Sequence, residues 1–402
     1  MRIGIVCFNL SWQSGGPRLV FALAQSLKKR GNTVVIYTPE FSGKYFKELW
    51  NGLDIRVVPT KELKWSGRPQ NLFVRIGRKI REEFARSKVA KNIAAAMGPD
   101  FDIVNVHDFA YSVGYFYKKR HPAAKILWTE NDPPYMYLPK QNPFFDVLSR
   151  IYNVWKDVSS RRYFLAIDKV SVLDFYNRAW CEKRGLRPAV VRLGVDSENF
   201  YLPVKDFYAG AKAKKVRIFA LGSLNKYRHY EDTIMAVKYL RDWGYDASAH
   251  IIANDMWNEK AYREEIMLII ADNNLEEAID IRFEGVSEKG LQVAYLESDV
   301  FVYAMYVPPP RDGFGFSIGV FEAMSAGLPV VLCRTTTSTE VLKDKKNALF
   351  VNPESPKQIA EQIKYLLDDP KEYKHIASAG QKFVKENLTW EKYTDSVLTL
   401  FT

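Results

Sequence analysis

Short apolar runs rich in β-branched residues alternate with helical patterns along this chain. Seven such runs lie between residues 2 and 193, beginning with RIGIVCF and ending with AVVRL, and six lie between residues 216 and 351. Strands of a parallel sheet are buried on both faces, so they read as continuous apolar runs, and helices connect them. The pattern therefore predicts an α/β protein built on doubly wound parallel sheets.

The length of the chain and one aperiodic segment divide this pattern into two domains. At 402 residues the chain exceeds the ~250–300 residues at which a single core usually stops growing. Residues 197–214 lack periodicity and mix Pro, Gly and Lys, which is typical of a linker. We therefore expect two Rossmann-like domains, residues 1–198 and 199–386, whose strand ends face one interdomain cleft that binds the ligand.

The segment DGFGFSIGVFEAMSAGLPVV, residues 312–331, combines a glycine-rich loop, a helix and a buried strand. Ser317 stands where the N-cap of the helix is expected, Glu322 lies within the helix, and Gly327 ends it. Backbone N–H groups at such a helix start attract anions, and a diphosphate is the candidate anion. Because a carboxylate matches a vicinal diol such as ribose, the segment indicates a sugar-nucleotide site. An exposed helix charge is the alternative for Glu322.

Two places in the first half carry further candidates. Gly15 and Gly16 precede Pro17 at an expected helix start, where small residues let a ligand approach the backbone. A plain glycine turn is the alternative, and the GxGxxG fingerprint of a nicotinamide or flavin site is missing. His107 ends the run IVNVH, at the strand edge where α/β enzymes place polar groups. The alternative to a histidine that hydrogen-bonds a sugar hydroxyl or an acceptor is a structural one.

Two basic residues in the second half, Lys226 and Arg228, follow a predicted strand in a loop. A diphosphate needs charge neutralisation, and arginine supplies a bidentate fork whose charge-assisted bonds contribute about 1.5–3 kcal/mol each. An ordinary surface loop is the alternative for both residues.

Several other classes of site are poorly supported. Three widely separated cysteines argue against a disulfide framework or a zinc site. The sequence shows no Ser/His/Asp order, HExxH motif or Cys/His cluster that would indicate a hydrolytic triad or a metal. The N-terminus lacks the layout of a signal peptide, and no apolar stretch reaches the ~18 residues of a membrane span. We therefore expect a cytosolic protein.

Much of the net charge of +11 comes from residues 61–91, which contain ten basic residues and only three glutamates. Leu72, Ile76, Ile80 and Phe84 recur every four residues there, which predicts an amphipathic helix whose other face is cationic. A solvated face on a core helix is one interpretation. Peripheral docking to anionic lipid headgroups at the cytoplasmic membrane face, at about 1 kcal/mol per basic residue, is the second. Nucleic-acid binding is the least supported interpretation, because no nucleic-acid-binding motif accompanies the basic residues.

Seven blocks of the chain together resemble the retaining glycosyltransferases of family 4, which have the GT-B fold of two facing Rossmann-like domains. The blocks are SGGPRLVFALAQSLKKRG, VHD, DKVSVLD, RLGVDSENF, ALGSLNKYRHYEDTIMAV, FEGVSEKGLQVAYLESDVFVYAM and FEAMSAGLPVV. The resemblance covers almost the whole chain. It implies that the acceptor binds residues 1–198 and the nucleotide sugar residues 199–386, and that a last helix in residues 387–402, with Trp390, crosses back onto the first domain.

The resemblance also implies roles for individual residues. Gly15 and Gly16 would lie near the donor phosphates and the acceptor, and His107 near the transferred sugar. On the donor side it implies Arg228 for the diphosphate with Ser223 and Lys226 beside it, Glu322 for the ribose, Glu288 in the loop that frames the base, and the helix start at Phe316, Ser317 and Ile318.

The chain departs from the family pattern at two positions. Phe314 stands eight residues before Glu322, where the family commonly has a glutamate that contacts the sugar, so Asp312 is the nearest candidate for that role. Ser223 follows Gly222 where the family has an arginine, so one phosphate contact is missing unless Lys226 supplies it.

The predicted activity is transfer of a hexosyl unit from a nucleoside diphosphate sugar to a hydroxyl acceptor with retention, with His107, Arg228 and Asp312 as the candidate catalytic residues. A lipid-linked acceptor or a glycan precursor is one alternative for the acceptor, and neither a metal nor another cofactor is expected. Two other functions stay open, namely a nucleotide-sugar-binding protein with little catalysis and another GT-B enzyme such as a sugar-nucleotide epimerase or a phosphorylase.

Overall fold

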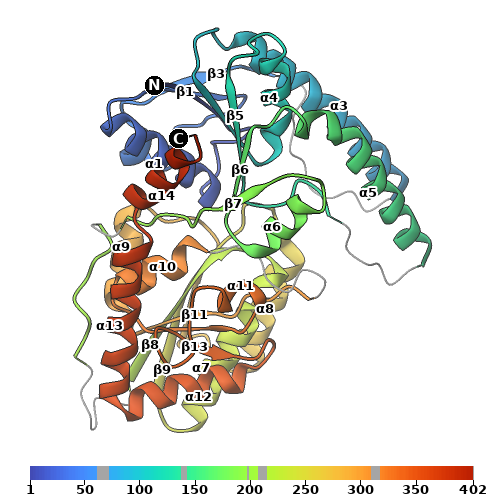
Figure 1. Ribbon diagram of the computed structural model, residues 1–402. Helices are drawn as coiled ribbons and strands as arrows, with labels where there is room; N and C mark the ends of the chain where they lie inside the picture. Colours follow the sequence, from blue (N-terminus) through green and yellow to red (C-terminus); the bar gives the residue numbers. More distant parts are fainter. Residues whose placement is uncertain (61–71, 137–142, 197–198, 207–214, 309–316, 402) are drawn as a thin grey trace. The chain divides into compact units, whose positions relative to one another are not determined.

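The computed structural model describes residues 1–60, 72–136, 143–196, 199–206, 215–308 and 317–401, and only the backbone of residues 72–80. The chain divides into two compact units (Figure 1). Unit 1 is Met1–Arg192 with Tyr393–Thr402, and unit 2 is Leu193–Lys392. Each unit is built on one parallel sheet.

The sheet of unit 1 has seven strands in the order β3-β2-β1-β4-β5-β6-β7. Strand β1 pairs in parallel with β2 on one side and β4 on the other. The strands are β1 (Arg2–Val6), β2 (Thr33–Thr38), β3 (Asp54–Val57), β4 (Ile103–His107), β5 (Lys125–Glu130), β6 (Lys169–Val172) and β7 (Pro188–Val190). The helices are α1 (Gly15–Lys29), α2 (Lys47–Trp50), α3 (Leu72–Ala96), α4 (Tyr111–Lys118), α5 (Pro143–Phe164) and α6 (Phe175–Glu182). The terminal helix α14 (Trp390–Thr399) belongs to unit 1 from Tyr393 onward.

The sheet of unit 2 has six strands in the order β10-β9-β8-β11-β12-β13. They are β8 (Lys215–Ser223), β9 (Asp246–Asn254), β10 (Ile279–Arg282), β11 (Val300–Tyr303), β12 (Val330–Cys333) and β13 (Leu349–Val351). The helices are α7 (Tyr230–Asp242), α8 (Lys260–Asp272), α9 (Glu288–Glu297), α10 (Ile318–Ser325), α11 (Thr336–Thr339), α12 (Pro356–Asp368) and α13 (Pro370–Asn387).

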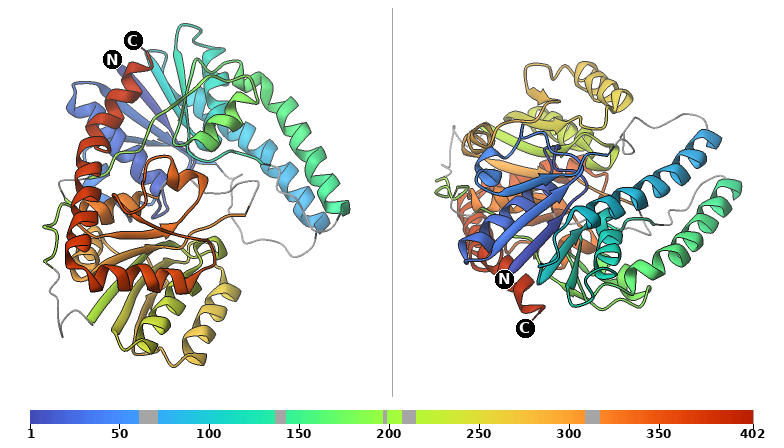
Figure 2. Two further views of the ribbon diagram at one scale, coloured as in Figure 1. Left: turned by 60° about the horizontal axis from the view of Figure 1, so that its bottom comes forward. Right: turned by 90° about the horizontal axis from the view of Figure 1, so that it is seen from above.

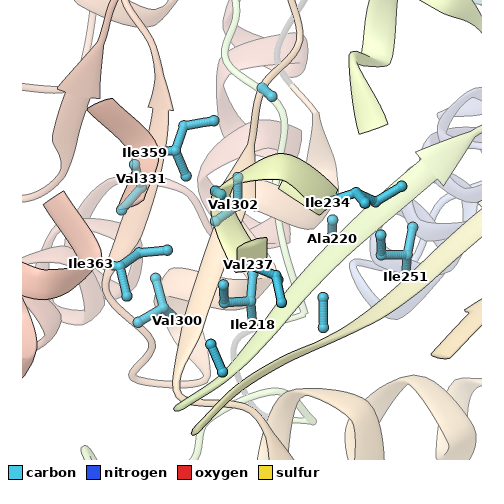
Figure 3. Packing of buried hydrophobic residues seen from close by; sticks show 14 of the residues in the cluster. Ile218, Ala220, Ile234, Val237, Ile251, Val300, Val302, Val331, Ile359 and Ile363 are labelled. Atoms are coloured by element: carbon cyan, nitrogen blue, oxygen red, sulfur yellow. The ribbon is translucent and has the colours of Figure 1, made fainter. Parts of the chain in front are cut away.

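The core of unit 2 shows why these runs form strands. Alternate residues of β8 and β11 point to one face of the sheet, where side chains of α7 and α12 meet them (Figure 3). Ile218, Val300 and Ile363 are each fully buried in this cluster. Burial of such a side chain contributes about 1.5–3 kcal/mol, so the continuous apolar runs are stable only with a helix over them. This confirms the predicted architecture of two Rossmann-like parallel sheets, with the seven and six strands that the apolar runs predicted.

The predicted helix in residues 61–91 is present as α3, but its apolar face was partly misassigned. Phe84 is 72% exposed, whereas the helix buries Val89, Ala90 and Ile93 near its end. An α-helix turns about 100° per residue, so a strict four-residue repeat drifts by about 40° at each step and does not stay on one face. Six basic residues of the segment, Lys61, Lys64, Arg68, Arg75, Arg78 and Lys79, have side chains outside the described part.

Candidate functional site

The strand order reverses once in each sheet, between β1 and β4 in unit 1 and between β8 and β11 in unit 2. At such a switch point the loops after the two strands run to opposite faces of the sheet, and ligands of open α/β sheets bind there. In unit 1 the first of these loops leads into α1, and the second follows His107, the last residue of β4. In unit 2 they carry Arg228 and lead to the start of α10. Within each unit, candidate residues that are distant in sequence therefore come together at the carboxyl edge of that unit's sheet.

The start of α1 lies two residues earlier than the sequence predicted. Gly15 and Gly16 are the first two residues of the helix, and Ser14 is the extended N-cap, so Pro17 is not the first helical residue. A Cβ atom built on Gly16 would meet nothing within 4 Å. Pro17 has no N–H and that of Arg18 donates to the carbonyl oxygen of Ser14, so the first-turn donors left for a ligand are those of Gly15 and Gly16. No acidic residue lies in that turn to compete with an anion.

His107 ends β4 as predicted and is only 1% exposed. Neither ring nitrogen has a hydrogen-bond partner among the residues that the structure describes. Burial lowers the pKa of His107 to about 3, so the imidazole is neutral near pH 7. A neutral ring offers one donor and one acceptor, and leaving both unused in a buried place costs free energy that a bound hydroxyl would recover.

The turn after His107 is held by Asp108, which has a left-handed backbone with φ of 46°. The carboxylate of Asp108 accepts hydrogen bonds from the backbone N and the side-chain Nδ2 of Asn131, at 2.9 and 3.2 Å. The indole of Trp128 donates to the carbonyl oxygen of Asp108 at 2.9 Å. A conformation that is unfavourable for a non-glycine residue persists only where such contacts enforce it, so the chain direction after His107 is fixed.

Replacing His107 with Gln is expected to flatten the dependence of stability on pH. An unfolded histidine binds a proton below about pH 6.5, whereas the folded His107 binds one only near pH 3, so stability falls as pH drops through that window. The Gln variant lacks this loss and should keep about 1–2 kcal/mol more of its pH 7 unfolding free energy at pH 5 than the wild type does. Denaturant titrations at both pH values measure it. Burial raises the pKa of Asp108 to about 6, but that carboxyl titrates in both proteins. Parallel pH profiles would contradict the burial of a neutral ring.

Arg228 lies in a short 3-10 turn, Lys226–Arg228, directly after β8. Its guanidinium carbon is 5.2 Å from the ring centroid of Tyr303 at the end of β11. A Cβ atom on Gly222 would come within 2.7 Å of that same carbon, so the guanidinium packs on the glycine backbone. Within the described part of the chain, Nε and Nη1 of Arg228 are buried and have no hydrogen-bond partner. A positioned cation with unused donors is suited to an anionic ligand.

The other residues predicted around the diphosphate differ in their surroundings. Lys226 is an exposed side chain whose Nζ lies 2.7 Å from a carboxylate oxygen of Glu265 on α8. Ser223 is the last residue of β8, and its hydroxyl accepts a hydrogen bond from Asn225 at 2.9 Å. The structure thus brings Arg228 to the switch point, while it pairs Lys226 with a surface acid.

The start of α10 lies beside the end of β8. Ser317 is the N-cap and Ile318 the first helical residue, as the sequence predicted. A Cβ atom on Gly319 would be 3.1 Å from Leu221, the neighbour of Gly222. Tyr303 and Ser317 also line one small cavity of about 30 Å³, together with Met305, Val320, Leu332, Cys333, Thr335, Thr337, Ser338 and Leu342. Because Tyr303 contacts Arg228 as well, the helix start and the guanidinium belong to one site. Asp312, Phe314 and Phe316 lie outside the described residues.

Glu322 lies in the second turn of α10 and is 1% exposed, so it is not the exposed helix charge that the sequence left open. The hydroxyl of Tyr295 donates to Oε2 of Glu322 at 3.2 Å and lies 3.1 Å from the carbonyl oxygen of Gly319. A buried carboxylate oriented by a neighbouring phenol is preorganised to accept hydrogen bonds from a ligand. Sequence reasoning missed Tyr295 and Tyr303; only the strand-end position of Tyr303 pointed to it.

Glu288 was wrongly expected in a loop. It is the first residue of α9, whose N-cap Ser287 accepts a hydrogen bond from the backbone N of Gly290 at 3.1 Å. The family resemblance implied a loop here, but Ser287 caps a helix, and Glu288, an acid in the first turn, complements the helix dipole.

Comparisons with known proteins identify the family. A family profile described as "Glycosyltransferase Family 4" matches residues 13–199, and one described as "Glycosyl transferases group 1" matches residues 205–383. Together the two matches span most of the chain, and residues 200–204, which lie in sequence between the strands of the two sheets, separate them. The chain belongs to the family 4 glycosyltransferases. It is therefore a glycosyltransferase with the GT-B pair of Rossmann-like domains.

Two curated relatives of this glycosyltransferase show how far the sequences have diverged. An uncharacterized glycosyltransferase of Methanocaldococcus jannaschii is 25% identical over 312 residues, which cover 75% of each protein. Spore coat protein SA of Bacillus subtilis is 27% identical over 117 residues, which are 29% of this chain and 30% of that protein. The second match therefore spans less than a third of the relative.

Solved structures share the fold over their whole length. The structure of Anabaena HepE in complex with UDP and glucose aligns with a TM-score of 0.72 at 14% identity, covering 100% of this chain and 99% of that one. Sucrose-phosphate synthase from Thermosynechococcus elongatus aligns with a TM-score of 0.70 at 15% identity, covering 100% and 98%. At these identities the likeness concerns the fold. Among the described helices of the glycosyltransferase, none is long and apolar enough to span a membrane.

Proposed function

We propose that this glycosyltransferase moves a hexosyl unit from a nucleoside diphosphate sugar to a hydroxyl acceptor, with retention of the anomeric configuration. The observation that carries the proposal is the Arg228 guanidinium, which is held beside the start of α10 with two buried donors that have no partner among the described residues. A diphosphate placed there would receive charge-assisted hydrogen bonds from Arg228 and backbone N–H groups from α10.

The donor class is supported by the chemistry of the neighbouring residues. The buried carboxylate of Glu322, one turn into the same helix, is suited to a ribose diol, and the Anabaena relative was solved with UDP and glucose. The positive charge for the diphosphate comes from Arg228 and the helix start under this proposal, so we expect that no metal is required.

The proposed mechanism rests on stabilising the leaving group. As the bond between the sugar and the phosphate oxygen lengthens, negative charge grows on the diphosphate, and fixed donors aimed at it lower the barrier. The neutral His107 would hydrogen-bond a hydroxyl of the transferred sugar, and the acceptor hydroxyl would attack the same face of the sugar as its proton passes to the departing phosphate. The proposal assigns no protein nucleophile. It leaves to Asp312, and to Lys226 once released from Glu265, the contacts that this chain lacks because Phe314 and Ser223 replace the acid and the arginine of the family pattern.

Two measurements test this function. A thermal-shift screen against nucleoside diphosphate sugars should show one donor raising the unfolding temperature, since a ligand at 100 times its dissociation constant adds about 2.7 kcal/mol to stability. Proton NMR of the product formed with that donor should show the anomeric configuration of the donor. An inverted product would refute retention, and stabilisation by no donor would refute the donor class.

Replacing Glu322 with Gln is expected to weaken binding of the selected donor by about tenfold, or about 1.4 kcal/mol. The side chain keeps its size and its contact with Tyr295, but the amide offers one acceptor oxygen instead of two. Isothermal titration with the donor and with the free nucleoside diphosphate measures the change. Glu284→Gln, at an exposed position of the same unit, is the control. Wild-type affinity in the Glu322 variant would remove this residue from the site.

A further inference from the structure

Helix α5 of unit 1 buries polar side chains along most of its length and exposes apolar ones to solvent. Asn153, Lys156 and Ser160 are buried along it, and the rings of Tyr163 and Phe164 are buried at its end. The exposed large apolar side chains are Phe144, Phe145, Val147, Ile151, Val154, Trp155 and Val158, followed by Leu165 just beyond the helix. Soluble proteins rarely expose a continuous apolar surface of this kind without a partner for it.

The spacing of the exposed side chains makes them one stripe. Positions 144, 147, 151, 154 and 158 follow each other at intervals of three and four residues, which places them on one face of an α-helix. Trp155 lies on the flank of the same face, and Ile151 and Val158 are 59% and 72% exposed. We refer to Phe144, Val147, Ile151, Val154, Trp155 and Val158 as the apolar stripe.

Buried polar contacts fix the orientation of the helix. Nζ of Lys156 lies 2.6 Å from a carboxylate oxygen of Glu83 on α3 and 3.4 Å from the hydroxyl of Tyr111. The hydroxyl of Ser160 is 3.3 Å from the same Tyr111 oxygen. Rolling α5 to hide the stripe would separate the buried ammonium of Lys156 from the partly buried carboxylate of Glu83, and a buried charge left without its partner is unfavourable. The outward apolar face is therefore a stable feature of the unit.

The charges around the apolar stripe favour binding to an anionic partner surface. Asp146 and Asp157 are each paired with an arginine, Arg150 and Arg184, at 2.9 and 2.7 Å. Exposed arginines flank the stripe on α5 itself, namely Arg150, Arg161 and Arg162, and α3 carries the further exposed bases Arg81, Lys88 and Lys91. Helix α3 runs beside α5 (Figures 1 and 2) and adds the exposed aromatic ring of Phe84.

We propose that the apolar stripe and the basic side chains that flank it form a surface by which this enzyme binds membranes containing anionic lipids. The apolar side chains enter the boundary between headgroups and acyl chains, and the arginines and lysines contact the headgroup phosphates. A second copy of the chain fits this surface less well, because it would bring the same cationic flanks together. An acceptor carried on a lipid would then be met in the plane of the membrane.

The test measures vesicle binding by the whole chain with no donor present, so it succeeds or fails independently of the proposed donor chemistry. We expect the wild type to float with vesicles of phosphatidylcholine that contain about one third phosphatidylglycerol, less with pure phosphatidylcholine, and less at high salt. The double variant Ile151→Glu with Val158→Glu should lower binding to the anionic vesicles by at least about tenfold.

A matched control separates the stripe from general effects of charge and exposure. Met267→Glu with Leu268→Glu changes two exposed apolar residues of α8 by the same charge and should bind vesicles like the wild type. Circular dichroism melts show whether each variant is folded. The proposal is overturned if the wild type does not bind anionic vesicles, if the variant on α5 binds them as well as the wild type, or if sedimentation shows that this variant instead dissociates a wild-type dimer.

Discussion

Replacing Arg228 with Ala is expected to lower kcat for glycosyl transfer by about 10²–10³-fold, while the protein stays folded. The guanidinium is the only group of the proposed site with a full positive charge fixed at the carboxyl edge of β8, as far as the described residues show, since Lys226 pairs with Glu265. Charge develops on the diphosphate mainly as the sugar leaves, so the loss should fall on kcat more than on donor affinity. Steady-state rates with the donor from the thermal screen measure it.

Two variants bracket this result. Arg228→Lys keeps the charge but loses the bidentate fork, so its rate should lie between those of the wild type and the Ala variant. Arg263→Ala removes an exposed arginine that also stacks on an aromatic ring, Phe283 at 4.3 Å, and should leave the rate unchanged. If Arg228→Ala turned over like the wild type, the diphosphate would have to bind elsewhere.

Much of the fold followed from the sequence because burial on two faces leaves a clear signature. Each apolar run, such as IVNVH, which ends at His107, or VRIFALG, which precedes Ser223, forms a parallel strand, since a strand between two layers of helices buries such a run on both faces. The positions of His107 and Arg228 at the carboxyl edges of their sheets followed in turn, because strand ends are fixed once the strands are known.

Other features depend on tertiary contacts that a single sequence does not encode locally. A helical pattern does not say which side faces the core, so the burial of Glu322 and the exposure of Phe84 emerged only with the structure. In α5 the apolar stripe, taken alone, is typical of the face that a helix turns toward the core. The ion pair between Lys156 and Glu83 instead holds the opposite face against the unit, so the stripe is exposed. Helix starts are also uncertain by a few residues, which is why Gly15 and Glu288 were placed outside their helices.

The substitution Gly222→Ala is expected to reproduce most of the loss caused by Arg228→Ala without touching the arginine itself. The new methyl carbon would lie 2.7 Å from the guanidinium carbon, 2.8 Å from Nε and 3.0 Å from Nη1, so the side chain must move away. Because it is the flexible end of a side chain that moves, the cost in stability should stay below about 1 kcal/mol, while kcat falls by about 10²-fold. Gly98→Ala, with its nearest neighbouring atom at 3.8 Å, is the control.

The double variant Gly222→Ala with Arg228→Ala shows whether the glycine acts through the arginine. Independent effects would multiply, whereas a glycine that only makes room for the guanidinium has nothing left to disturb once Arg228 is gone. The double variant should therefore be as fast as Arg228→Ala alone. A rate well below that of either single variant would mean that Gly222 has its own contact with the donor, as expected if the diphosphate approaches the backbone at the end of β8.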